Sequence, residues 1–440
     1  MEIIEEIKNN GLFSNPSEIQ KICLDKLKTN PLPNIKSELW RLSNKSKFSS
    51  FLDYSFKNTE SKLDLPYKYD SQNIIRLIIG ENNSIDLKKE SYWIRKLKDK
   101  EIIDYIRKNI SDFDQNENWS DLLNHSLSVK ENILGLNISG TKIPPIEILS
   151  ASSSNSFNAK TLIILVEKNC KIDLLQINLG KENSSLSQST YLCLAENTLV
   201  NHGVVAYGKK KSHLLNSLNV IQNSNSEYNL GSLHFKFNYA RFEIRINQIE
   251  GNAKTLIVFF EKNCNVDLLQ INIGEKNSSL SQSTYFCLEE NTLVNHGVVS
   301  YGESKSNLLN SLNVIQKAKS EYSLGSLHFK FNYARFEIRI NQIDGYAKTT
   351  IKGIQITKKN DQIATYTNIQ FNGPNGFLDQ INKSLADDKS HAVFEGAIIV
   401  PKIAQKTDAS QLSRNLLLSK NAKIDTKPQL EIIADDVKCK

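Results

Sequence analysis

The sequence predicts a protein of mainly β structure, in which a β-solenoid follows an N-terminal helical region. Three observations lead to this prediction. From about residue 126 onward, short runs such as 242–246 alternate apolar and polar residues, and this period of two is typical of a strand with one buried face. Turns that contain asparagine separate these runs at similar intervals. A long segment also occurs twice in succession, as repeat architectures do.

The N-terminal region, residues 1–125, is expected to be mostly helical. Residues 14–16, Ser-Asn-Pro, have the composition of a helix start. The apolar face of the helix that follows carries Ile19, Ile22, Cys23 and Leu27. A second helical period is predicted over residues 88–110, and a turn-rich connector over residues 31–43 lies between the two.

The turns of residues 126–440 share the form x-Asn-small. Asparagine tolerates the left-handed backbone that such a turn needs. The six turns are at Asn169, Asn197, Asn252, Asn263, Asn291 and Asn421. Two of the intervals are 28 residues (197 − 169 and 291 − 263), which suggests coils that stack on one another. A β-sandwich is the alternative, because it also consists of many short strands.

The repeated segment covers residues 158–251 and 252–345, an offset of 94 residues without a gap. The two copies are identical at 75 of 94 positions, which indicates a recent in-frame duplication or an error of sequence assembly. The repeat favours the solenoid, because a solenoid accommodates extra coils and a closed sandwich does not. Four coils of about 23 residues would keep the register across 94 residues, whereas coils of 28 residues would not.

Composition limits the classes of partner. The formal charge is +7 over 440 residues, and the lysine clusters 209–211 and 358–359 lack interleaved aromatic residues, so no nucleic-acid partner is predicted. No apolar run approaches the roughly 20 residues of a membrane helix, so no membrane insertion is predicted. The N-terminus lacks the features of an export signal. The expected location is the cytoplasm, or a plastid if a transit peptide has been lost.

The cysteines show no local metal-binding pattern, since no CxxC or CxxH spacing occurs. Four of the six lie in apolar alternating runs, where a small buried side chain is the expected role. These four are Cys170 and Cys193, with their copies Cys264 and Cys287.

No catalytic residue is predicted. The histidines that recur in the repeats, His202/His296 and His234/His328, are expected to be structural. The chain has no Ser-His-Asp order, GxSxG, P-loop or HExxH motif. Glu243/Arg245 and Glu337/Arg339 alternate on strands as same-face ion pairs, which contribute little if exposed. A polysaccharide lyase or hydrolase on a β-solenoid stays an alternative, although the carboxylates are scattered.

The last fifty residues, 391–440, carry the most specific pattern. They resemble the SufB/SufD core of the SUF iron–sulfur cluster assembly system, and its SufD branch in particular. The matching runs are 394–396, 404–409, 415–419, 426–432 and 434–439. Pro33 and residues 38–41 also resemble the N-terminal segment of that branch.

The resemblance implies a right-handed parallel β-helix with helical ends and a non-catalytic scaffold. Its implied partners are a SufB-like subunit and a SufC-like ATPase. No cofactor would be bound stably, because the iron–sulfur cluster forms transiently in the complex and ATP is bound by the partner. A rearranged solenoid without such a function is a further alternative.

One site residue follows from the resemblance. Cys439 matches a family position implicated in cluster assembly and is therefore a candidate metal or sulfur ligand, although a buried strand cysteine is an equal interpretation. The family pattern continues with a histidine and a helical segment that binds SufC, whereas this sequence ends at Lys440. Docking of SufC through that segment is therefore left open.

Overall fold

The computed structural model describes residues 17–29, 74–79, 92–111, 119–248 and 252–440. The chain is mainly β, with 62% strand and 9% helix, and forms a parallel β-solenoid of about 11 turns with a few N-terminal helices. This confirms the predicted fold class. None of the described helices is both long and apolar enough to cross a membrane.

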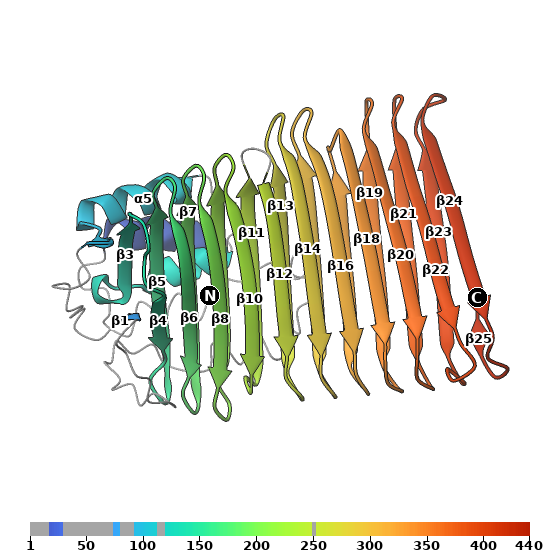
Figure 1. The fold of residues 1–440 in the computed structure, drawn as a ribbon, viewed down its shortest axis with the longest axis horizontal. Helices are drawn as coiled ribbons and strands as arrows, with labels where there is room; N and C mark the ends of the chain where they lie inside the picture. Colours follow the sequence, from blue (N-terminus) through green and yellow to red (C-terminus); the bar gives the residue numbers. More distant parts are fainter. Residues whose placement is uncertain (1–16, 30–73, 80–91, 112–118, 249–251) are drawn as a thin grey trace. The chain divides into compact units, whose positions relative to one another are not determined.

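The chain divides into two units by its internal contacts. Unit 1 comprises residues 1–220 and 236–244, and unit 2 comprises residues 221–235 and 245–440. Within each unit, successive strands alternate between two sheets, so that one coil contains two strands (Figure 1).

Unit 1 contains a few helices and one set of coils. Strands β9 and β11 begin in this unit and end in unit 2. The helices are α2 (Glu18–Thr29), α5 (Asp99–Ser111), α6 (Trp119–Leu127) and the 3-10 helix η1 (Lys130–Asn132). The strands are β1 (Ile75–Ile78), β2 (Ile94–Lys96), β3 (Ile133–Ile138), β4 (Ile146–Ala151), β5 (Ser156–Val166), β6 (Lys171–Gly180), β7 (Ser184–Leu194), β8 (Leu199–Gly208), β9 (His213–Gln222) and β11 (Tyr239–Gln248).

The described elements of unit 2 are all strands. They are β10 (Glu227–Phe235), β12 (Asn252–Phe260), β13 (Asn265–Gly274), β14 (Ser279–Leu288), β15 (Leu293–Gly302), β16 (Asn307–Gln316), β17 (Glu321–Phe329), β18 (Tyr333–Gln342), β19 (Lys348–Thr357), β20 (Gln362–Phe371), β21 (Phe377–Ala386), β22 (His391–Val400), β23 (Asp408–Leu417), β24 (Lys423–Ile432) and β25 (Lys438–Cys439).

Helix α2 begins with a reciprocal cap. The backbone N–H of Ser17 donates to the Gln20 side chain (2.8 Å), and the N–H of Gln20 donates to Ser17 Oγ (3.3 Å). The predicted apolar face is confirmed, because Ile19, Cys23 and Leu27 are buried. The predicted cap at residues 14–16 and the predicted connector at residues 31–43 lie outside the described residues.

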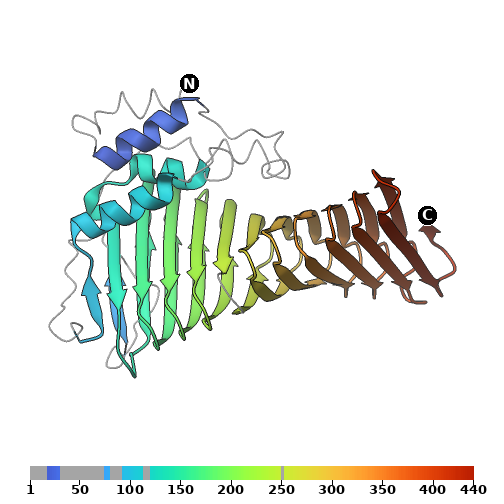
Figure 2. The ribbon, with the colours of Figure 1, turned by 90° about the horizontal axis from the view of Figure 1, so that it is seen from above.

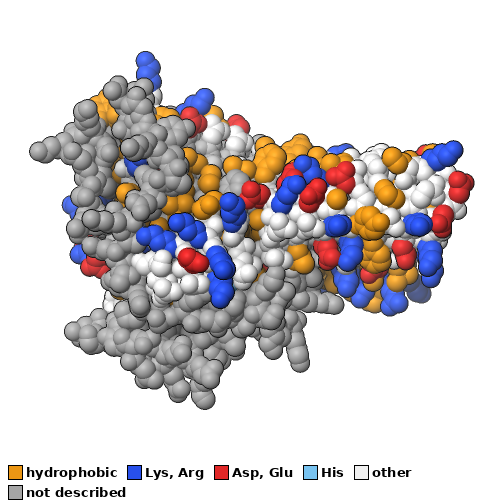
Figure 3. All heavy atoms as spheres, turned by 90° about the horizontal axis from the view of Figure 1, so that it is seen from below, with side chains coloured by type: hydrophobic (Ala, Val, Ile, Leu, Met, Phe, Trp, Pro, Cys, Tyr) orange, Lys and Arg blue, Asp and Glu red, His pale blue; other side chains and the backbone are white. Residues whose placement is uncertain are grey.

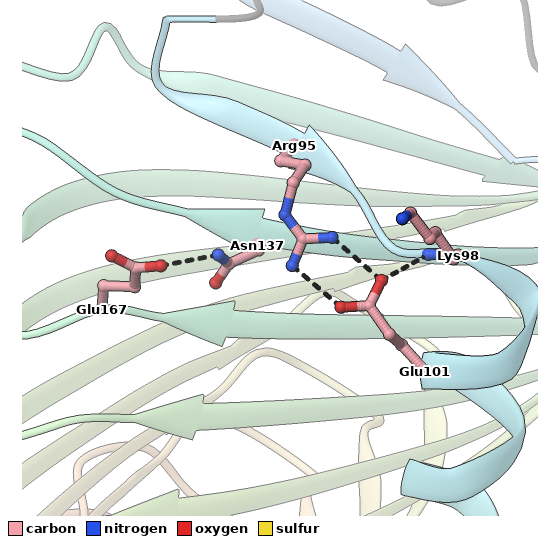
Figure 4. Close-up of polar contacts among 5 residues, drawn as sticks. All are labelled: Arg95, Lys98, Glu101, Asn137 and Glu167. Carbon is pink, nitrogen blue, oxygen red and sulfur yellow. Dashed lines mark hydrogen bonds and ion pairs between the residues drawn. The ribbon is translucent and has the colours of Figure 1, made fainter.

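Of the helix predicted over residues 88–110, residues 88–91 lie outside the described residues. The prediction is wrong for the part before Asp99, because β2 is a strand that pairs antiparallel with β3. Helix α5 begins only at Asp99. The Glu101 carboxylate accepts hydrogen bonds from the Lys98 N–H (2.7 Å) and from both terminal nitrogens of Arg95 (2.9 and 3.0 Å), as Figure 4 shows. The bonds from Arg95, followed by that from Lys98, lower the pKa of Glu101 to about 2. This carboxylate fixes the change from strand to helix.

The asparagine turns are confirmed at four of the six predicted positions. Asn169, Asn197, Asn263 and Asn291 have φ between 55° and 63°. The prediction is wrong at the other two, because Asn252 is the first residue of β12 and Asn421 does not have a positive φ. In many of these turns the following hydroxyl residue donates to the carbonyl three residues earlier, as Thr198 does to Ala195 (3.0 Å). The hydroxyl closes the turn and satisfies that carbonyl.

The length of a coil differs from the expectation. Lys171 pairs with Leu199 and Asn265 with Leu293, so one coil is 28 residues and not 23. The 94-residue offset relates β5 to β12 and therefore spans seven strands, or three and a half coils. The two copies keep the same inward and outward positions, because the strand with its turn is the repeating unit and not the whole coil.

Close packing at one turn gives a testable prediction. A Cβ at Gly302 would lie 2.7 Å from Cδ1 of the buried Phe331 ring, whereas a Cβ at Gly231 would meet nothing within 4 Å. Gly302→Ala is expected to lower the free energy of unfolding by about 1–3 kcal/mol through overpacking. Gly231→Ala is the matched control, and its urea midpoint is expected to stay unchanged. Equal midpoints for the two variants would contradict the packing argument.

Candidate functional site on the last coils

Cys439, the predicted ligand, lies in β25, where it pairs with Ala409 of β23. The thiol is half-buried, and burial, followed by the nearby Asp408 carboxylate, raises its pKa. A raised pKa keeps the thiol protonated, whereas a metal ligand must be a thiolate. The described residues contain no group of three or more His, Cys, Asp or Glu side chains placed to hold a metal ion. The structure therefore brings no set of ligands to Cys439, and its role stays a prediction.

The four repeated histidines are inside the coils. His202, His234, His296 and His328 are all at most 3% exposed. Burial lowers the pKa of His202, His234 and His328 to about 3, so these rings are neutral. A neutral ring costs less to bury than a charged one.

The rings make specific contacts in the core. His296 Nδ1 is 2.8 Å from Tyr322 Oη, and His234 Nε2 is 2.6 Å from Ser232 Oγ. The His328 ring stacks on Phe336 with ring centroids 3.5 Å apart. These are the contacts of packed core residues, as the sequence predicts for them.

The duplicated cysteines differ in burial. Cys170 and Cys264 are buried, as predicted. Cys193 and Cys287 are only half-buried, because both are at outward positions of their strands. The prediction of burial is therefore confirmed for one pair only.

The repeated Arg-x-Glu-x-Arg run has two different environments. Arg241 Nε is 2.7 Å from Glu243 Oε1, with both side chains at most 3% exposed, so Glu243 has a buried arginine partner other than the Arg245 that the sequence suggests for it. In the second copy the Arg335–Glu337 pair (2.8 Å) has side chains 38% and 26% exposed. Glu337 also contacts Arg339.

A shallow concavity of about 220 Å³ lies on the outer face of β18, β20, β22 and β24. Its charged lining is Arg335, Glu337, Arg339 and Glu395. The Arg335 guanidinium lies over the Tyr366 ring at 4.0 Å, a cation–π contact. Glu337 is held ionised, because hydrogen bonds from Arg335 lower its pKa. Glycoside hydrolysis needs a carboxyl with a raised pKa, so this site gives no support to the lyase or hydrolase alternative.

The charged row continues along the last two strands of this sheet. Asp425 of β24 is 2.8 Å from both His391 Nε2 of β22 and Lys423 Nζ, and Glu395 is 3.2 Å from Lys427. Hydrogen bonds from Lys423 and His391 lower the pKa of Asp425. The surface that Figure 3 draws shows side chains of both charges mixed with hydrophobic ones. Sequence reasoning identified only the β18 members of this row, since the others lie on strands distant in the chain.

The last coil leaves apolar side chains and a strand edge exposed. The exposed hydrophobic residues are Leu412, Leu416, Leu417, Leu418, Leu430, Ile432 and Ile433. Among the described strands, β24 is the last of its sheet and pairs only with β22. Such an edge can pair with a strand of another chain. Lys423, Lys427 and Pro428 on β24 limit unspecific pairing.

Comparison with known proteins matches this part of the chain to one family. Residues 247–440 match the family model described as SUF system FeS cluster assembly, SufBD core domain. An iron–sulfur cluster assembly SufBD family protein of Synechocystis is 32% identical over 199 residues, 42% of this chain and 43% of the relative. The iron–sulfur cluster assembly protein SufD of Escherichia coli is 44% identical over 101 residues, 22% of this chain and 23% of the relative.

A third relative is the protein ABCI7, chloroplastic, of Arabidopsis thaliana, which is 34% identical over 127 residues, 29% of this chain and 27% of the relative. The chain thus spans less than half the length of each of these three relatives. The matches agree with the open, strand-rich last coils and confirm the resemblance that residues 391–440 suggest. Residues 247–440 are therefore similar to the SufBD core domain of the SUF system, and the chain resembles SufD in sequence.

Proposed function

We propose that this chain is a non-catalytic scaffold subunit in iron–sulfur cluster assembly, where it pairs with a SufB-like subunit and depends on a SufC-like ATPase for ATP. The observation that carries the proposal is the match of residues 247–440 to the SufBD core domain. The relatives named as iron–sulfur cluster assembly proteins support the same role.

The last coil supplies a surface for the SufB-like partner. The open edge of β24 offers backbone groups for strand pairing, and the exposed Leu430 and Ile432 of the same strand offer apolar contact. Lys423 and Lys427 favour a partner edge that carries acidic side chains.

The cluster is cargo of the assembled complex in this proposal, and Cys439 is the residue of this chain that we assign to it. It is half-buried in β25, the last described strand of the other sheet, where it pairs with Ala409 of β23. Binding of iron or sulfur would then require loss of the thiol proton, which burial in the free chain opposes. The cytoplasm is the location that we propose, and the chloroplastic relative makes a plastid the alternative.

Co-purification tests this function. A tagged 440-residue chain, co-expressed with SufB-like and SufC-like subunits, is expected to retain both partners. Leu430→Asp, which places a charge at a 49% exposed apolar position on β24, is expected to reduce recovery of the SufB-like subunit about tenfold. Tyr346→Asp is the matched control at a 56% exposed apolar position in the turn between β18 and β19, and it is expected to leave recovery unchanged. Recovery of neither partner with the unaltered chain would rule out the proposed function.

A further inference from the structure

Helix α6 in unit 1 lies against the outer face of the sheet that contains β5, β7, β9 and β11 (Figure 2). Its Asp121 carboxylate is the centre of the contact. One oxygen accepts from Ser189 Oγ (2.7 Å), and the other accepts from Ser217 Oγ (3.0 Å) and from Asn219 Nδ2 (3.3 Å). Three neutral donors on two strands thus satisfy one buried carboxylate.

Further polar contacts join α6 to this sheet. Ser120 Oγ donates to Glu243 Oε1 (2.6 Å), and His125 Nε2 is 2.7 Å from Tyr191 Oη. Asn124 Nδ2 donates to Thr161 Oγ1 (2.9 Å). Apolar contact accompanies these bonds, because Ile163, Tyr191 and Leu215 belong to the same core cluster as the leucines of α6.

The second repeat carries the same set of side chains. Each sheet residue that contacts α6 in these ways has an identical counterpart 94 positions later. The counterparts are Thr255, Ile257, Ser283, Tyr285, Leu309, Ser311, Asn313 and Glu337. They lie on β12, β14, β16 and β18, which are neighbours in one sheet of unit 2. Ser283 pairs with Ser311, and Ser311 pairs with Glu337, so the set is contiguous.

The apolar members of this set are exposed in unit 2. Ile163, Tyr191 and Leu215 are at most 3% exposed, whereas their counterparts Ile257, Tyr285 and Leu309 are 39%, 46% and 50% exposed. Ile257 pairs with Tyr285, while Leu309 lies next to Ser281 on the other side of the polar set. Exposed apolar side chains that flank polar ones mark a surface that binds another protein. No described helix covers β12 to β18.

We propose that the outer face of β12, β14, β16 and β18 is a second helix-docking site, which binds a helix of α6 chemistry supplied by another molecule. The partner helix presents a carboxylate in its first turn and an amide about one turn later, on a face with leucines. The chain has one α6 for two such faces, and this α6 is linked directly to η1 and β3 of unit 1. Among the described helices none is left to cover the second face, so we assign that face to a helix of another molecule. This proposal does not depend on the role in cluster assembly.

Fluorescence anisotropy tests the site with the full 440-residue chain. The probe is a fluorescein-labelled synthetic peptide of residues 92–132, which contains the sequences of α5 and α6. Saturable binding is expected. Ser311→Asp places a like charge opposite the peptide residue Asp121 and is expected to weaken binding about tenfold. Ser323→Asp, at an outward, similarly buried position of β17 in the other sheet, is the matched control and is expected to bind as the unaltered chain does.

A charge exchange completes the experiment. A peptide with Asp121→Lys is expected to bind the Ser311→Asp chain more tightly than the unaltered peptide does, because the two charges are then opposite. Absence of saturable binding, or binding that Ser311→Asp leaves unchanged, would overturn the proposal. Self-association of the 440-residue chain that Ser311→Asp abolishes would also overturn it, because the face would then belong to a second copy of the chain.

Discussion

Glu243→Ala is expected to lower the free energy of unfolding of unit 1 by about 3–5 kcal/mol, because it leaves a buried arginine without its carboxylate. Glu337→Ala changes the same residue of the second repeat and is expected to lower the free energy of unfolding of unit 2 by less than about 1 kcal/mol. The two sites share the sequence Arg-Phe-Glu-Ile-Arg, so the difference measures the environment alone.

The reason lies in solvent access. Arg241 and Glu243 have side chains 3% and 1% exposed, and Ser120 of α6 adds a hydrogen bond to the same carboxylate. Removal of Glu243 therefore uncovers a charge that water cannot reach. Arg335 is 38% exposed and stacks on Tyr366, so water and the ring stabilise its positive charge when Glu337 is removed.

Tryptophan fluorescence during urea unfolding measures the effect on unit 1, because Trp119 in α6 is 1% exposed and packs in its core. The fluorescence midpoint is expected to fall strongly for Glu243→Ala and to stay in place for Glu337→Ala. Hydrogen exchange of the β18 amides reports on unit 2 in the same samples. Equal shifts of the two variants would contradict the role of burial.

Much of the fold follows from local sequence. Alternation in runs such as 242–246 predicts strands, and these residues lie in β11. The coil length does not follow from asparagine positions alone, because lysines at equivalent turns, such as Lys211 and Lys305, also adopt a left-handed backbone, with φ of 55° and 62°. A search for asparagine alone overlooks the turns that contain lysine. The 14-residue step from one strand to the next is therefore not recognised.

The environment of the candidate sites follows from sequence only in part. The inward position of His202 and His328 is predictable from alternation, since each lies in a strand of period two. The difference in solvent exposure between Glu243 and Glu337 is not predictable from alternation, because the residue that covers Glu243 is Ser120, more than 120 positions earlier in the chain. Contacts between segments so far apart in sequence leave no local pattern.

The buried histidines predict that the protein loses stability in mild acid. The pKa of His202, His234 and His328 is about 3, lowered by burial from 6.5, and that of His125 is lowered to about 4 for the same reason. Unfolding exposes each ring, which then binds a proton below pH 6.5 that the folded state does not bind. Stability is therefore complete above about pH 6.5 and falls as the pH drops toward about 3.

The free energy of unfolding is expected to fall by at most about 1.4 kcal/mol per pH unit for each buried histidine. Urea midpoints measured between pH 7.5 and pH 4.5 are expected to fall continuously below pH 6.5. His328→Gln removes one ring that binds a proton only in the unfolded state. The free energy of unfolding of this variant is therefore expected to fall less per pH unit, by about the contribution of one histidine. His391→Gln, on the outer face of β22, leaves the buried rings in place and is expected to keep the full slope. An unchanged slope for His328→Gln would mean that water reaches this ring in the folded protein, contrary to its 2% exposure and its stacking on Phe336.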